Sequence, residues 1–179
     1  VEKKEIVRLA KKLSGEYQSI KKYLLGLNMT HRHIFEAVRQ ELVRVFTLGV
    51  TGFDTPGSAN AIPEAVKAME SISEAMSAYY PLISDQDKIL VDECAELFKN
   101  AITFLKNGEF ETFDRLTFVK EYIDPLYGII YKMHRKTGIE TVDEVNSLPM
   151  ALNYHATSIF SNDFLNDDYY VNLDLSHPA

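Results

Sequence analysis

Two residues have the spacing of metal ligands. His33 and Glu36 lie three positions apart in "HRHIFE", so a helix would place both side chains on one face, close enough to share an ion. A metal site usually needs three or four ligands, and the sequence has no Glu-x-x-His pair of the kind that di-iron bundles use. His33 and Glu36 are therefore weak candidates, and the pattern favours a surface or partly buried pair that interacts weakly.

The other reactive side chains lack partners in the sequence pattern. Cys94 is the only cysteine, which excludes an internal disulfide, a zinc site built on several thiolates and a C-x-x-C-H haem attachment. His134 and His155 stand alone, and a lone histidine is more often a hydrogen-bonding residue than a catalyst. No G-x-S-x-G, H-E-x-x-H or other nucleophile–base constellation occurs. We expect no catalytic residue, cofactor or metal in this chain.

The stretch "GFDTPGS" at 52–58 superficially matches a phosphate-binding loop, but the lysine is missing and a predicted helix precedes it instead of a strand. The residues favour a corner between two helices. Gly52 supplies a left-handed residue that closes the first helix, Phe53 folds back on that helix, and Asn60 or a nearby polar group caps the next. The turn itself is expected from Asp54, Thr55, Pro56 and Gly57.

Composition excludes several classes of protein. The 179 residues suit one domain, and 46% hydrophobic with 25% charged residues is ordinary for a globular chain. A net charge of −7 argues against nucleic acid as a partner, because binding to phosphates needs a basic face. No apolar run approaches the roughly 20 residues of a membrane span, and the first residues lack a signal-peptide apolar region.

Amphipathic stripes predict five main helices. Thr30 and Ser84 are the expected N-caps of the second and fourth helices, while Pro63 lies in the first turn of the third and Pro81 stops it. Cys94 falls on an inward stripe, so we expect a buried core residue and not a reactive thiol. The five stripes lie within residues 6–27, 34–46, 65–79, 90–105 and 116–133.

The fifth predicted helix has the strongest pattern, with a stripe that begins at Leu116. Asp114 is the expected N-cap, which makes Phe113 and Phe118 the two ends of a hydrophobic staple. Pro125 lies in its middle, where proline removes a hydrogen bond and costs about 3 kcal/mol. The apolar register passes through the proline, so we predict one kinked helix that ends at Gly138.

The pattern weakens after residue 138. We expect a helical turn at 141–146, a short helix at 151–160 and then an extended tail over the aromatic-rich stretch "SNDFLNDDYYVNLDLSHPA". The predicted fold is all-α, an antiparallel bundle of about five main helices with one proline-kinked helix and an irregular aromatic-rich C-terminal tail. Residues 1–168 are expected to form a single domain, with 169–179 as a tail or linker toward a further domain.

Two segments resemble a known family. "QELVRVFTLGVTGFDTPGSANAIPEA" (40–65) and "FDRLTFVKEYIDPLYGIIYKMH" (113–134) are similar to the N-terminal helical extension of certain bacterial di-haem cytochrome c peroxidase-family proteins, and "LNYHATSIFSNDFLNDDYYV" (152–171) is similar to its end. In that family the extension precedes the haem-bearing domain. The structural motif residues that carry the resemblance are Gly52, Phe53, Asp54, Pro56, Gly57, Asp114, Arg115 and Pro125.

The resemblance implies a non-catalytic accessory domain of a periplasmic oxidoreductase that reduces hydrogen peroxide with electrons from a small cytochrome. Haem c is then expected in a downstream domain, because this chain has no C-x-x-C-H motif. The implied partners are that haem domain and a small electron-donor protein. Nucleic acid and a membrane span are not implied.

A second resemblance is to imelysin-like helical bundles, which are periplasmic proteins linked to iron uptake with a G-x-H-x-x-E motif. When the motif is aligned on His33 and Glu36, His31 occupies the glycine position, so the motif is incomplete. This resemblance implies a module that binds iron or another metal or ligand. It remains the alternative to the accessory domain.

Overall fold

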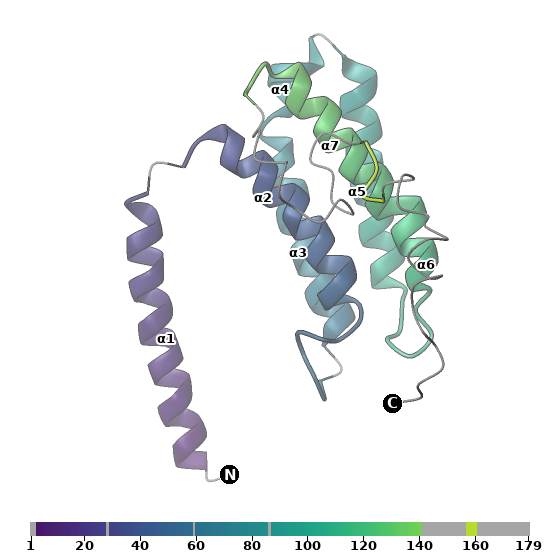
Figure 1. The fold of residues 1–179 in the computed structure, drawn as a ribbon. Coiled ribbons are helices and arrows are strands. Elements are labelled where there is room, and N and C mark those ends of the chain that lie inside the picture. Colours follow the sequence, from purple (N-terminus) through teal and green to yellow (C-terminus); the bar gives the residue numbers. More distant parts are fainter. Residues whose placement is uncertain (1–2, 28, 59, 86, 141–156, 161–179) are drawn as a thin grey trace, which may run out of the picture. The chain divides into compact units, whose positions relative to one another are not determined.

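The computed structural model describes residues 3–27, 29–58, 60–85, 87–140 and 157–160 (Figure 1). The chain forms two compact units, Val1–Thr30 and His31–Ala179. The first contains the long helix α1 (Lys3–Leu25). The described residues are helices joined by turns and loops, without a strand, which confirms the all-α class. None of the helices in these ranges is long and apolar enough to cross a bilayer.

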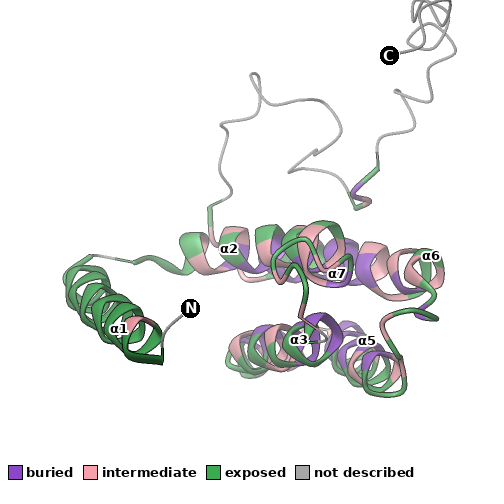
Figure 2. Ribbon diagram, turned by 90° about the horizontal axis from the view of Figure 1, so that it is seen from below, coloured by how far each residue is buried: buried purple, intermediate pink, exposed green. Residues whose placement is uncertain are grey.

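The second unit is an antiparallel bundle. Its successive long helices run in alternating directions (Figure 1). Seen from below, α2 and α7 form one layer and α3 and α5 the other, with the buried residues on the facing sides (Figure 2). The elements are α2 (His31–Arg44), a π-helical turn η1 (Val45–Gly49), α3 (Ala61–Ser77), α4 (Tyr80–Ser84), α5 (Lys88–Lys106), α6 (Arg115–Phe118), a π-helical turn η2 (Val119–Ile123) and α7 (Asp124–Lys136).

The space between the two layers is filled by the stripes of all four helices. Phe35, Met69, Phe98 and Ile130, one from each, are fully buried. Cys94 is also fully buried, as expected for a core residue. Burial raises the pKa of its thiol to about 11, so the thiol stays protonated and unreactive at neutral pH.

The start of the last helical segment follows the predicted cap. The Asp114 carboxylate accepts a hydrogen bond of 2.9 Å from the Thr117 backbone N–H. The rings of Phe113 and Phe118 lie 5.5 Å apart between centroids, which confirms the hydrophobic staple. The predicted apolar stripe is wrong at its first residue. Leu116 is 69% exposed, and Phe118 is the residue that faces the core.

Residues 115–136 form one helical run through Pro125, as predicted, and the π-helical turn η2 lies directly before the segment that contains the proline. The Asp124 N–H donates to the Val119 carbonyl, five residues back, directly before the proline. Proline has no N–H and its ring crowds the carbonyl four residues earlier, so a wider turn lets the helix continue past it. The run ends at Gly138, which has a positive φ of 69°.

Two predicted helix ends are wrong. Ser84 lies inside α4, and the N-cap of α5 is instead Asp87, which accepts a hydrogen bond of 3.2 Å from the Leu90 N–H. Pro81 does not stop α3, which already ends at Ser77; it lies in the first turn of α4. The physical reason is that proline suits the first turn of a helix, where its missing N–H would be unsatisfied anyway.

The four residues 157–160 pack against α7 as a series of bends, so the short helix predicted to reach residue 160 is wrong at this end. The Asp124 carboxylate accepts hydrogen bonds from the Ser158 hydroxyl at 2.9 Å and the Ile159 N–H at 2.7 Å. The contact needs a glycine at position 128, because a Cβ on Gly128 would lie 2.3 Å from a backbone carbonyl oxygen of the segment.

Several predictions for the C-terminal part fall outside the described residues. These are the helical turn at 141–146, the beginning of the helix at 151–156 and the extended tail from 161 onward. The boundary between residues 168 and 169 lies there as well, so the division into one bundle domain and a tail stays a prediction.

Candidate functional site

The two segments that carry the resemblance meet in space through Arg115, the first residue of α6. Its Nε donates to the Val50 carbonyl at 2.9 Å, beside the GFDTPGS stretch. Its two Nη atoms donate to the carbonyls of Phe110 at 2.9 Å and Phe113 at 3.2 Å. The guanidinium also lies 4.8 Å from the centre of the Phe110 ring. One side chain therefore joins the corner (residues 50–58) to the loop at 107–114.

The corner closes the helical run of α2 and η1 in the predicted way. Gly52 has a φ of 75°, its N–H donates to the Gly49 carbonyl, and the Phe53 N–H donates to the Leu48 carbonyl. This is the paired hydrogen-bond pattern of a Schellman motif. Only the backbone of Phe53 folds back, however: its side chain is 74% exposed, so a packing contact on the helix is not formed. Gly57 is also left-handed, with a φ of 73°.

Ion pairs and backbone bonds complete the corner. Arg44 binds both Asp54 and Glu41, the latter at 2.6 Å, and so links the corner to the end of α2. Asn60 stands at the N-cap position of α3, but its side chain makes no capping hydrogen bond. Instead the Ser58 hydroxyl accepts a hydrogen bond of 3.0 Å from the Asn60 N–H.

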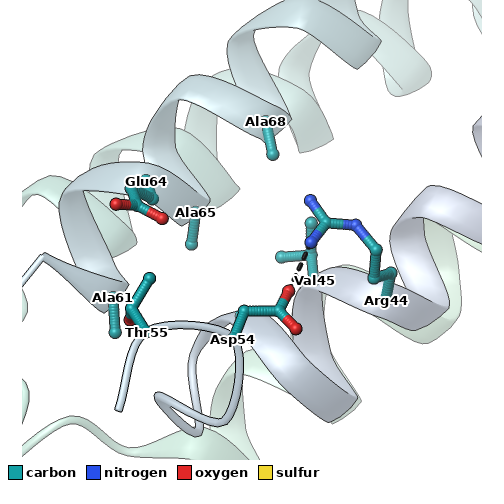
Figure 3. Close-up of a pocket in the computed structure, with 9 residues that line it drawn as sticks. Arg44, Val45, Asp54, Thr55, Ala61, Glu64, Ala65 and Ala68 are labelled. Carbon is teal, nitrogen blue, oxygen red and sulfur yellow. Dashed lines mark hydrogen bonds and ion pairs between the residues drawn. The ribbon is translucent and has the colours of Figure 1, made fainter. Parts of the chain in front are cut away.

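A small pocket of about 30 Å³ lies between the corner and α3 (Figure 3). The Arg44–Asp54 pair borders it on one side and Glu64 on the other. The Thr55 hydroxyl is buried at its edge and has no hydrogen-bond partner among the described residues. This volume and these polar atoms suit ordered water, because one water needs only about 10–15 Å³ of such space. The pocket is too small for an organic ligand.

A larger, open hollow of about 420 Å³ lies on the other side of the corner, where it faces the loop at 107–114. It is lined by Gly52, Thr55, Gly57 and Ser58 of the corner and by Glu109, Phe110 and Glu111 of the loop. The residues that line it include no histidine, lysine or cysteine.

Sequence reasoning missed a buried arginine of α2 that packs on tyrosine rings of α7. Arg39 is only 2% exposed, with its Cζ 3.7 Å from the centre of the Tyr127 ring and 5.2 Å from that of Tyr131. Phe35 stacks on His134 at 4.4 Å with an interplanar angle of 4°. The spacing of the two tyrosines, four apart on one helix face, was a signal for a shared partner. It did not identify an arginine as that partner.

The candidate metal ligands both lie on α2. His33 is exposed and Glu36 is partly buried. Among the described residues there is no group of three or more histidine, cysteine, aspartate or glutamate side chains that could hold an ion. His31 faces the bundle, with its Nδ1 3.0 Å from the Tyr79 hydroxyl. Metal binding at His33 and Glu36 stays a prediction.

The structure thus divides the predicted motif residues into two places. One is the corner together with the start of α6, where Asp114 is the N-cap and Arg115 is the first helical residue. Pro125 lies ten residues further along the same helical run, which corresponds to about 15 Å at 1.5 Å per residue. The residues gathered at the corner are Gly52, Phe53, Asp54, Pro56, Gly57, Asp114 and Arg115.

The first prediction separates backbone strain from steric contact at the corner. A Cβ on Gly52 would lie 2.8 Å from the Phe110 Cζ, whereas a Cβ on Gly57 meets no atom within 4 Å. Both substitutions force alanine into a left-handed conformation, at about 1–2 kcal/mol. Gly52→Ala should therefore destabilise more than Gly57→Ala in urea unfolding. Equal losses would contradict a close contact with Phe110.

The second prediction concerns Arg115. Arg115→Ala leaves the Val50 and Phe110 carbonyls without their donor, while the Phe113 carbonyl keeps the Arg115 backbone N–H, and we expect a loss of about 2–3 kcal/mol in the free energy of unfolding. Arg115→Lys should recover only part of this, because an ammonium lacks the planar fork of donors. The control is Arg135→Ala, an arginine truncation at an exposed position. Equal effects of the two alanine variants would contradict a joining role for Arg115.

His134 has an altered proton affinity. Burial lowers the pKa of its imidazole; a hydrogen bond with the backbone of Glu140 acts in the opposite direction, and the positive charges of Arg39, Arg135 and Arg32 lower it further. Neutral His134 therefore suits the stacked position against the ring on α2.

This shift predicts a pH dependence of stability. The pKa of His134 in the folded chain lies below the unfolded value of about 6.5, so the unfolded chain binds the proton more readily. The contribution is fully present above pH 6.5 and is lost as the pH falls from there toward the folded pKa. Urea unfolding across this range should show a weaker pH dependence for His134→Gln than for the parent. If the free energy of unfolding depended on pH equally in both proteins, a lowered pKa of His134 would be contradicted.

Comparison of this chain with protein-family models, with curated proteins and with solved structures found no match. The fold is established by the helices and their packing, as described above. The resemblance to the peroxidase-family extension consequently rests on the residues of the three quoted segments.

Proposed function

We propose that this chain is the helical, non-catalytic part of a periplasmic di-haem cytochrome c peroxidase-like protein. The haem c groups would be attached outside this chain, because Cys94 is its only cysteine and no C-x-x-C-H motif is present. The complete protein would reduce hydrogen peroxide with electrons from a small cytochrome. This part would pack on the haem domain or help to present the surface that meets the electron donor.

The observation that supports the proposal best is the contact of Arg115 with the Val50 and Phe110 carbonyls. The two segments that carry the resemblance are separated in the sequence, yet Arg115 of one donates a hydrogen bond to the Val50 carbonyl of the other. A shared structural unit explains why "GFDTPGS" and "FDRLTF" occur together better than two unrelated similarities do.

The test is the haem content of the complete natural gene product. We expect a periplasmic protein that keeps its haem on a denaturing gel, because c-type haem is covalently attached, and that shows the absorption spectrum of two c haems. The purified protein should oxidise a reduced small cytochrome when peroxide is added. The matched variant, Arg115→Ala in the same protein, should lower thermal stability and leave the haem content unchanged.

A gene product without covalent haem would contradict the proposal. Elemental analysis of this chain provides a second check, because the imelysin-like alternative requires a bound ion. Stoichiometric iron or zinc that is lost in His33→Ala, with Lys132→Ala as an exposed control, would favour the metal-binding alternative.

A further inference from the structure

Helix α1 carries an apolar stripe that the described structure leaves exposed. The helix has no buried residue. Ile6, Leu13 and Ile20 are 55%, 68% and 57% exposed, and Tyr17 and Leu24 are 61% and 51% exposed. Large apolar side chains in one row on a helix indicate a surface that is covered by a partner.

The spacing of the stripe indicates which kind of partner covers it. Its residues repeat every seven positions in two parallel rows, the d and a positions of a heptad, over nearly three heptads. A repeat of seven, instead of the 3.6-residue period of an isolated helix, keeps the seam against a second helix in a left-handed supercoil. One row is Ile6, Leu13 and Ile20, continued by Leu27 just beyond the helix, and the other is Ala10, Tyr17 and Leu24.

The charges beside the seam fit a second copy of the same helix. With Tyr17 at a and Ile20 at d, Glu16 takes position g and Lys21 position e. In a parallel in-register pair, position g of one helix faces position e of the following heptad of the other. Glu16 of each copy therefore meets Lys21 of the second copy, and the attraction occurs twice because the pair is symmetric.

We propose that α1 forms a parallel coiled coil with α1 of a second copy of this chain. Five of the remaining basic residues do not oppose this pairing, because Lys4, Arg8, Lys11, Lys12 and Lys22 lie on the outer positions of the heptad. Lys3 falls on an a position, but it is the first residue of the helix, where a long side chain can keep its ammonium group in water. Glu16 now makes only a weak exposed contact of 3.6 Å with Lys12, which pairing with the second copy can replace.

Two other partners are alternatives for covering the apolar stripe of α1. The helix has seven basic and two acidic side chains, whereas the whole chain has a net charge of −7, so α1 could also attach to an anionic lipid surface or to an acidic surface of its own chain. Neither requires a seven-residue repeat or the Glu16–Lys21 register.

Charge reversal in the full chain tests the register. In sedimentation equilibrium, Glu16→Lys and Lys21→Glu should each weaken the dimer roughly tenfold, because two attractive pairs become two repulsive ones. The double variant Glu16→Lys/Lys21→Glu should restore the affinity of the parent. A basic helix on an acidic surface behaves differently: Lys21→Glu would weaken attachment and Glu16→Lys would strengthen it. Opposite effects of the two single variants would overturn the proposal.

A seam variant tests the apolar contact. Leu13→Glu should give a monomer at every concentration that yields a dimer of the parent, while the control Lys22→Glu, with the same new side chain on an outer position, should remain dimeric. Circular dichroism checks that both retain their helices. The dimer should persist in high salt, since apolar contacts carry it. A parent chain that is monomeric throughout, or a monomer that binds phosphatidylglycerol vesicles and leaves them in high salt, would refute the coiled coil.

Discussion

The arrangement of the second unit depends on the satisfaction of three backbone carbonyls by one guanidinium. The corner and the loop at 107–114 have no regular hydrogen-bond ladder, so their carbonyl groups need other donors. Arg115 has five N–H groups in a fixed fork and bonds Val50, Phe110 and Phe113 at once. Because it is also the first residue of α6, the same contact sets where the last helical run begins. Asp114 caps that run, and the two neighbouring residues fix both its start and its direction.

The sequence was sufficient where a residue's role depends on its neighbours in the chain. Asp114 as a cap, Phe113 with Phe118 as a staple and Gly52 as a left-handed closing residue all follow from local backbone geometry, and all were correctly predicted. The five helical segments follow from amphipathic periodicity for the same reason. Ser84 shows the limit of such reasoning: it is a good cap by type, but a further helical turn occupies its position and Asp87 caps α5.

The sequence was insufficient where the helical period changes or a polar residue is buried. Val45 and Val50 are both buried although they are five residues apart, a spacing that would separate them by about 140° on an α-helix. The π-helical turn between them adds the residue that brings both inward. Phe118 and Ile123 flank the second π-helical turn in the same way, which explains why Leu116 is exposed. A fixed 3.6-residue period cannot predict such a shift.

Helix α1 and the buried Arg39 both show that burial depends on which partner is available. An apolar stripe shows that a helix face needs cover, but its periodicity does not say whether the cover comes from the same chain. A charged residue on a helix is expected to be exposed to solvent, unless an aromatic ring takes the place of water beside its charged group. Arg39 is buried because the Tyr127 ring faces its guanidinium at 3.7 Å. The stripe of α1 is exposed although its apolar pattern matches that of the core helices. In both cases the partner, and not the residue type, determines burial.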